Sequence, residues 1–331
     1  VAHESTKVLY QYEGTPSFVL DVPSRANYTF DGWYLGETAI TDADGQALAP
    51  WTSLSGATVV AKWTHNTAVD DAVLELDEAE DFYALARILE PASAPGSVTN
   101  LADYARFGFE TYSADAYESL KHGSYRLTQD ITLSNYDRNL HAGNGFYGIS
   151  NFMGTFDGAG HTITLDIDLS KYETAPVVSG TVRIGVFASV QGATIKDLKL
   201  DGTVTGTYTA PSNTTYVDLG LLIGTTLTDS DKNTRLERIT ADVAVDAELS
   251  HGQKTIYFGT MIGRANSGLD DVNRIVLEHC ENMGDYTVNM AGVSSNASRV
   301  GGLIGHAYPG VKFDSCVNSG DITTTGGNAS V

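Results

Sequence analysis

Histidine and acidic side chains mark the places where this sequence could carry out chemistry. His161 follows a Gly-Ala-Gly turn that begins directly after Asp157, so a catalytic His–Asp pair is one interpretation. The favoured interpretation is a structural turn, because glycine permits positive φ and an aspartate can bond to its own backbone.

Asp270 and Asp271 could act as the paired carboxylates of a polysaccharide-cleaving enzyme. No Gly-His-Gly, Asn-Thr-Asp or neighbouring basic triad accompanies them, so we interpret this pair as part of a solvated loop.

Two short segments place oxygen donors at alternate positions, as calcium-binding loops do. One contains Asp42 and Asp44, and the other contains Asp229, Asp231 and Asn233. Both lack a glutamate at the twelfth position, so ordinary Asx turns are favoured and calcium is the alternative.

Zinc-protease chemistry requires His-Glu-x-x-His, and the His-Glu pair at residues 3–4 is followed by Ser-Thr-Lys. We predict no catalytic residue, and no cofactor other than calcium as that alternative.

Tyrosines on the expected loops provide a candidate ligand-binding surface, because aromatic side chains are enriched at interfaces. They are Tyr172, Tyr208, Tyr216 and Tyr308. The alternative is that they are the scattered surface tyrosines of an ordinary β protein.

Charge and composition limit the classes of partner. The 331 residues include 41 acidic and 20 basic side chains, for a net charge of −21. Nucleic acid and anionic membrane surfaces would be repelled, and no apolar run approaches the roughly 18 residues of a membrane span. Many glycines, tyrosines, threonines and valines favour short strands joined by tight turns. We therefore expect a mostly β protein that binds neither nucleic acid nor membrane.

Residues 1–65 are expected to form a compact β module. Short strands alternate with turn clusters, and Phe30, Trp33 and Trp63 can supply most of the apolar area of a small core. The aromatic segment at 28–34 and the closing strand at 59–63 resemble the Listeria–Bacteroides repeat, the β-grasp-like B repeat of internalins. The resemblance implies a non-catalytic spacer or adhesive unit on the cell exterior. An aromatic ligand platform is the alternative.

Residues 66–124 are expected to form a linker and a helical cap. The segment 77–89 has helical periodicity, acids in its first turn, and a proline at position 91 just beyond its end. A second short helix is expected near 114–120. Strands resume at residue 125.

A repeated glycine motif organises residues 125–331. Each of the four copies begins with an apolar residue followed by a glycine and continues with mostly apolar residues. Three of the copies then end in a second glycine. The first glycines are Gly185, Gly220, Gly259 and Gly301, which gives intervals of 35, 39 and 42 residues. In the first copy Ser189 stands where the second glycine is expected, so this coil is expected to turn differently.

Two further strands follow each motif and align into columns of like residues. Three strands per repeat is the count of one β-helix coil, and stacking is compulsory because one coil buries too few side chains to offset its loss of backbone entropy. Coils spaced about 4.8 Å apart place like residues over like. The expected columns are Ile195, Leu236, Leu277 and Phe313; Leu198, Ile239, Cys280 and Cys316; Leu200, Ala241, Asn282 and Asn318; and Val204, Val245, Tyr286 and Ile322.

This repeat resembles the GLUG-motif family, which recurs in bacterial surface proteins and in N-terminal regions of immunoglobulin A metalloproteases. The resemblance covers about 125–323 and implies a right-handed parallel β-helix with an N-terminal helical cap. We expect the native chain to continue beyond Val331, because the last coil would otherwise leave an unpaired edge.

The two cysteines are predicted to be reduced, buried thiols. Cys280 and Cys316 fall in one column, where their α-carbons lie within disulfide range. Side chains in register on parallel strands point the same way, however, and do not reach the required torsion. Burial rather than disulfides must therefore stabilise the fold.

The sequence as a whole favours an extracellular bacterial adhesion or surface-presentation protein that is not an enzyme. A rigid rod would present loops to a glycan or protein ligand of a host or cell surface, next to further domains of the same chain. One alternative is a β-helix polysaccharide lyase or hydrolase. The other is a non-catalytic N-terminal region of an immunoglobulin A metalloprotease.

Overall fold

The computed structural model separates the chain into two units, Val1–Asp71 and Ala72–Val331. It describes residues 19–23, 28–36, 38–49, 59–65, 73–89, 101–109, 113–135, 148–171, 179–210, 214–229, 232–250, 255–266, 274–290 and 298–325. No helix among these residues is long and apolar enough to cross a membrane.

The first unit contains a small antiparallel sheet in the order β2-β1-β3. Its strands are β1 (Tyr28–Leu35), β2 (Thr38–Ala39) and β3 (Val60–His65). Phe30 is buried and packs edge-to-face on the partly buried Trp33, with ring centroids 5.8 Å apart. The backbone of Trp63 pairs with that of Phe30, but the side chain of Trp63 lies outside the described residues. The aromatic core expected here therefore rests on Phe30 and Trp33.

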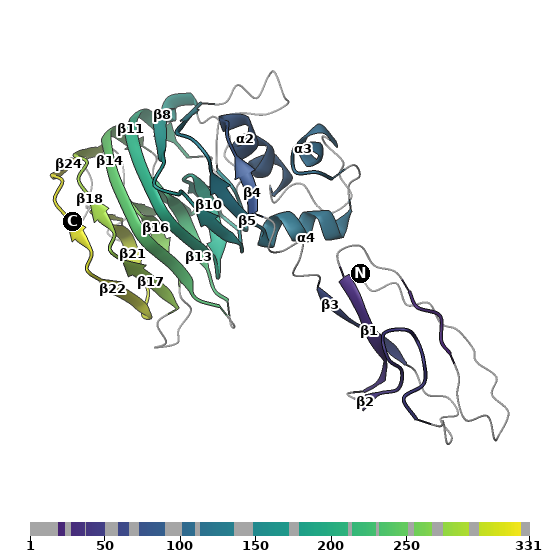
Figure 1. The fold of residues 1–331 in the computed structure, drawn as a ribbon. Helices are drawn as coiled ribbons and strands as arrows, with labels where there is room; N and C mark the ends of the chain where they lie inside the picture. Colours follow the sequence, from purple (N-terminus) through teal and green to yellow (C-terminus); the bar gives the residue numbers. More distant parts are fainter. Residues whose placement is uncertain are drawn as a thin grey trace. The chain divides into compact units, whose positions relative to one another are not determined.

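The second unit begins with the helical cap. It comprises β4 (Val73–Leu76), α2 (Ala79–Ile88), α3 (Leu101–Arg106) and α4 (Ala114–His122), which lie at one end of the stacked strands in Figure 1. The ring of Phe82 on α2 packs on Phe156, which in turn packs on Phe187, with centroids 5.5 Å apart in both pairs. The expected helices near 77–89 and 114–120 are present, and α3 is additional.

Parallel strands build the solenoid from Ser124 onward (Figure 1). The largest sheet contains β5 (Ser124–Leu127), β6 (Ile131–Ser134), β7 (Thr155–Asp157), β8 (Thr162–Asp168), β11 (Thr194–Thr209), β14 (Thr234–Ser250), β17 (Ile275–Glu278), β18 (Glu281–Asn282), β19 (Tyr286–Asn289), β22 (Val311–Asp314), β23 (Val317–Asn318) and β24 (Ile322–Thr325), together with β4. A short 3-10 helix, η1 (Leu169–Lys171), follows β8. The predicted class, a small β module followed by a parallel β-helix with few helices, is confirmed.

Two four-stranded parallel sheets carry the glycine motifs. One runs in the order β20 (Arg299–Gly301), β15 (Thr255–Gly259), β12 (Tyr216–Gly220) and β9 (Thr181–Ile184). The other runs in the order β10 (Phe187–Gln191), β13 (Ile223–Leu227), β16 (Ile262–Ala265) and β21 (Ile304–Ala307). The motif glycines let the two sheets approach closely, since a Cβ added at Gly220 would lie 1.9 Å from the Ile223 carbonyl oxygen.

The expected columns are confirmed by the strand register. Leu236 lies between Ile195 and Leu277, and Phe313 follows Leu277. The columns that end in Asn318 and Ile322 are likewise continuous from one coil to the next. The first motif departs from expectation, because Ser189 pairs with Thr225. Ala188 therefore stands at the level of Gly224, and this motif is one residue shorter than the others.

Burial declines at the last coil, whose strands β22 and β24 lie at the end of the stacked strands away from the helical cap in Figure 1. Leu277 is fully buried, whereas Phe313 of the same column is 49% exposed. Both cysteines are free thiols, but only Cys280 is fully buried and Cys316 is partly exposed. This corrects the expectation of two buried thiols, because no described coil covers Cys316.

Candidate functional site

Two of the four predicted tyrosines lie in one side-chain cluster. Tyr216 and Tyr308 are partly exposed and are connected through Tyr257 and His306. Tyr208 is 1% exposed and therefore cannot belong to a surface, which corrects that expectation. Tyr172 lies outside the described residues.

The cluster is built by two facing columns of the glycine-motif sheets. The first column has Arg183, Asp218, Tyr257 and Arg299, one from each of β9, β12, β15 and β20. The second has Ser189, Thr225, Arg264 and His306, from β10, β13, β16 and β21. We use the name tyrosine–arginine cluster for Arg183, Tyr216, Asp218, Tyr257, Arg264, His306 and Tyr308.

Its aromatic rings form a continuous series of contacts. Tyr216 and Tyr257 stack with centroids 6.2 Å apart and an interplanar angle of 17°. Tyr257 stacks on His306 at 4.6 Å, and His306 meets the edge of Tyr308 at 5.0 Å. The guanidinium of Arg264 lies 4.9 Å from the centroid of Tyr216 and 5.9 Å from that of Tyr257, within cation–π range. The Tyr257 ring therefore contacts Tyr216, His306 and Arg264, all of them members of the cluster.

A buried ion pair holds Arg264 in place. Its Nη2 atom lies 2.8 Å from Oδ2 of Asp218, whose side chain is fully buried, while that of Arg264 is 14% exposed. The Thr225 hydroxyl donates to the same oxygen at 2.6 Å. Such a pair is sensitive to loss of one partner, because the other charge is left buried and uncompensated.

The electrostatics of the cluster follow from burial. Burial raises the pKa of Asp218 to about 6, although Arg264, Thr225 and Arg183 each favour its ionised form. Burial also lowers the pKa of Arg183. The pKa of His306 is lowered by burial and by the charges of Arg299 and Arg264, so His306 is neutral at physiological pH. The positive charge of the cluster therefore comes from arginine.

Three polar atoms of the cluster are buried without a hydrogen-bond partner among the described residues. They are Nε of Arg183, Nε of Arg264 and Oδ1 of Asp218. A buried polar group without a partner costs about 1–3 kcal/mol, and such groups call for a functional or structural reason.

The comparisons with known proteins add one distant match. The chain is 27% identical to part of Halomucin from Haloquadratum walsbyi over 215 residues, which cover 56% of this chain. They cover 2% of Halomucin, so the chain spans only a small part of that protein. No family model matches the chain, and no solved structure matches it. The match and the β-solenoid are compatible with a surface protein.

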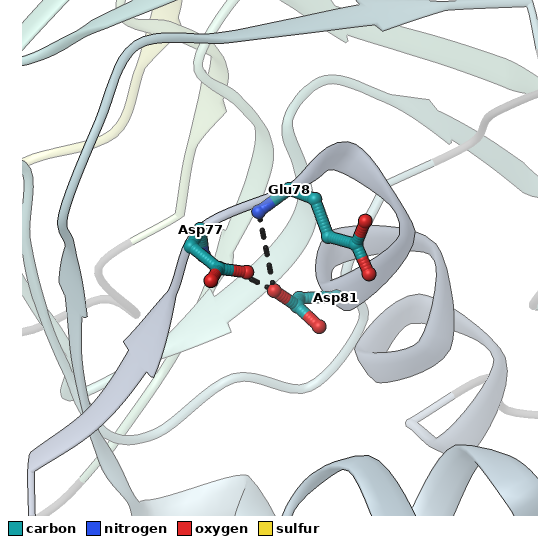
Figure 2. A group of neighbouring side chains, drawn as sticks. All are labelled: Asp77, Glu78 and Asp81. Atoms are coloured by element: carbon teal, nitrogen blue, oxygen red, sulfur yellow. Dashed lines mark hydrogen bonds between the residues drawn. The ribbon is translucent and has the colours of Figure 1, made fainter.

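A second cluster of acids lies at the start of α2. Figure 2 shows Asp77, Glu78 and Asp81, whose carboxylates lie within 4.8 Å of one another. Oδ2 of Asp81 accepts the backbone N–H groups of Asp77 and Glu78, at 3.1 and 3.2 Å. The guanidinium of Arg106 lies 2.6 Å from Glu78 and 2.8 Å from Asp81. These contacts cap the helix and pair two of the three carboxylates with one guanidinium, so we interpret the group as structural.

The predicted calcium segments are only partly described. Oδ1 of Asp42 accepts the backbone N–H groups of Asp44 and Gln46 at 3.0 and 2.8 Å, the geometry of an Asx turn. Oδ1 of Asp229 accepts from the backbone N–H of Lys232 at 3.1 Å. Asn233 is exposed, and Asp231 lies outside the described residues. Calcium binding at either segment stays a prediction.

The turn that precedes His161 has the contacts of a structural turn and not those of a His161–Asp157 pair. Oδ1 of Asp157 accepts the backbone N–H of Ala159 at 2.8 Å, and its Oδ2 pairs with Arg126 and Lys196. His161 instead lies 3.2 Å from the exposed Asp130, whose pKa is lowered chiefly by the backbone N–H of Thr162. Asp270 and Asp271 lie outside the described residues.

Sequence reasoning missed five members of the cluster, which are Arg183, Asp218, Tyr257, Arg264 and His306. A signal was present, because each member of the first column stands two positions before the first glycine of a motif. Those positions are 183, 218, 257 and 299, and their side chains differ in every coil. Alignment of the apolar residues alone left this position out.

Proposed function

We propose that the chain is a non-catalytic module of an extracellular surface protein, and that it binds a host or cell-surface ligand at the tyrosine–arginine cluster. The carrying observation is that Tyr216 and Tyr257 lie around Arg264 on a rigid parallel solenoid, and that Tyr308 joins them through His306. Tyrosine and arginine are enriched among residues that dominate binding energy.

The position of the cluster on the solenoid supports this role. Its side chains come from successive coils of two regular sheets, and sites on such rigid elements are held more precisely than sites on loops. The backbone is ordered before binding, so little conformational entropy would be lost on association. The tyrosine–arginine cluster is therefore suited to presentation on a rod.

Two observations support a surface location. One is the distant match to Halomucin. The other is the resemblance of residues 5–64 and 125–323 to the Listeria–Bacteroides and GLUG repeats of bacterial surface proteins. We include membership of those families in the proposal.

A binding assay with tyrosine variants tests the proposal. The purified chain is applied to arrays of glycans and to host cells, beside Tyr216→Ala and Tyr308→Ala. Tyr34→Ala is the matched control, because Tyr34 is partly exposed but lies in the first unit. We expect at least a tenfold loss of binding for the two cluster variants and none for the control. Equal binding by all four proteins would contradict the proposal.

A further inference from the structure

The last described coil, residues 298–325, exposes apolar side chains at one end of the solenoid. Phe313 and Ile322 stand in inward columns directly after Leu277 and Tyr286, which are at most 1% exposed. Phe313 itself is 49% exposed, and Ile322 is partly exposed. Among the described residues, this end therefore presents apolar surface that the preceding coil buries against its neighbour. We call it the open end.

Backbone groups at the open end also lack partners among the described residues. The carbonyls of Asp321 and Thr325 accept N–H groups from the preceding coil, as do those of Gly310 and Asp314. Alternate residues of a strand direct their N–H and C=O groups to opposite sides, and no described strand pairs with the outer side of β22 or β24. The residues that direct both groups outward are Val311, Phe313, Ile322 and Thr324. Such a row of unpaired groups is a template for another strand.

The last coil carries no net charge, unlike the chain as a whole. Residues 298–325 contain two basic side chains, Arg299 and Lys312, and two acidic ones, Asp314 and Asp321. The whole chain has a net charge of −21. Two copies of the chain could therefore meet at their open ends without the repulsion expected between surfaces of one sign.

The opposite end of the solenoid is closed. The helical cap, formed by β4 and by α2, α3 and α4, lies there in Figure 1, and its residues Leu76, Phe82 and Leu120 are fully buried. Head-to-tail stacking of two copies would have to displace this cap. Two open ends can instead meet about a two-fold axis, and such a contact closes without leaving a further surface for growth.

We propose that the open end is a dimer interface, which binds the open end of a second copy of this chain. A two-fold axis reverses strand direction, so the edge strands of the two copies would pair antiparallel and bury Phe313 of each. This inference goes beyond the proposed function. The tyrosine–arginine cluster reaches the last coil through His306 and Tyr308, so a dimer would hold two copies of the cluster beside one interface.

Sedimentation equilibrium of the full chain, over a hundredfold range of concentration, tests the association. We expect the average mass to rise from that of one chain to that of two and then to stay constant. A monomer at every concentration would overturn the proposal, whether another segment, a different partner or solvent covers the open end. Species that keep growing with concentration would also overturn it, because a two-fold contact does not extend.

Two variants test where the copies meet. Phe313→Ala should weaken the dimer at least tenfold, because it removes apolar surface from the contact. Thr324→Pro removes an outward N–H group, a change that an edge strand tolerates, and should weaken the dimer similarly. Met283→Ala is the control, since Met283 is 40% exposed and follows β18 one coil further in. Circular dichroism checks folding, and Phe313→Ala decides if Thr324→Pro does not fold. An unchanged dimer in the folded variants would overturn the interface.

The thiol of Cys316 provides an independent measurement. Cys316 is a partly exposed free thiol of the last coil, between Phe313 and Ile322 in the sequence. Its modification by an excess of maleimide should be at least tenfold slower at a concentration where the protein is dimeric than in dilute solution. An unchanged rate while the mass doubles would place the contact elsewhere and overturn the proposal. Neither measurement requires a ligand, so both are independent of the proposed function.

Discussion

Two kinds of residue column run along the same solenoid and differ in how they vary from coil to coil. The inner kind repeats one chemistry, as in Ile195, Leu236, Leu277 and Phe313. The outer kind changes at every coil, as in Arg183, Asp218, Tyr257 and Arg299. Both have the same parallel register. Stacking alone accounts for the uniform columns, because each coil must bury apolar side chains against its neighbours, whereas the varied column needs a local explanation at each position.

Truncation within a uniform column should have the largest effect on stability. Leu277→Ala should lower the free energy of unfolding by about 2–5 kcal/mol, because it leaves a cavity between two coils. Phe313→Ala removes a larger side chain from the same column, but should cost less than about 1.5 kcal/mol because Phe313 is 49% exposed. Urea denaturation of both variants measures the contrast. A larger loss for Phe313→Ala would show that the last coil is as tightly packed as the middle ones.

In the varied column, Asp218 should affect the free energy of unfolding through its protonation rather than through a cavity. The pKa of Asp218 is raised from 3.8 to about 6. Asp218 therefore binds a proton more readily in the folded state than in the unfolded state. Its contribution to stability is fully present below about pH 3.8 and is lost as pH rises through about 6. Relative to Asp218→Asn, the wild type should therefore gain stability between pH 7 and pH 4, by at most about 3 kcal/mol for a shift of about two units.

Asp197 provides the opposite sign as a control. Arg238 holds the pKa of Asp197 below its ordinary value, so its contribution is present above the unfolded pKa and is lost as pH falls through the folded one. In denaturation experiments, the difference between wild type and Asp218→Asn should thus change between pH 7 and pH 4, whereas the difference between wild type and Asp197→Asn should change with the opposite sign, and only as pH falls below about 3.8. Parallel curves would mean that burial does not dominate at Asp218.

The columns were predictable because apolar residues must recur wherever coils stack, and the spacing of the glycines placed each coil. Other features depended on strand length, which the sequence pattern left open. The segments around Leu200 and Val204 were expected to be two strands, yet β11 is continuous from Thr194 to Thr209. In that longer strand Tyr208 lies four residues after Val204, so its side chain points to the same, inward side and is buried rather than exposed. Only two of the seven residues of the tyrosine–arginine cluster, Tyr216 and Tyr308, were predicted, because its members come from two sheets whose relative placement could not be derived from one strand at a time.

The two cysteines should report the same contrast between coils. Burial raises the pKa of Cys280 to about 12, and its thiol is fully buried, whereas Cys316 is partly exposed. A maleimide reagent should therefore modify Cys316 in the folded protein and Cys280 only after unfolding. Mass spectrometry of peptides from the native protein measures each site. Equal protection of both thiols would show that something covers the last coil in solution.

The smallest expected effect concerns a third column, which is varied but has a backbone explanation. Asp197, Arg238, His279 and Ser315 all have positive φ, between 53° and 55°, at the same corner of successive coils. Left-handed conformations cost a non-glycine residue about 1–2 kcal/mol, and glycine avoids this cost but loses more entropy on folding. His279→Gly should therefore change the free energy of unfolding by at most about 1 kcal/mol, in the stabilising direction, because His279 is exposed. Destabilisation in a thermal melt would mean that the His279 side chain has a role of its own. Variation along a column indicates function only where, as at Asp218 and Arg264, the side chains are also buried and incompletely paired.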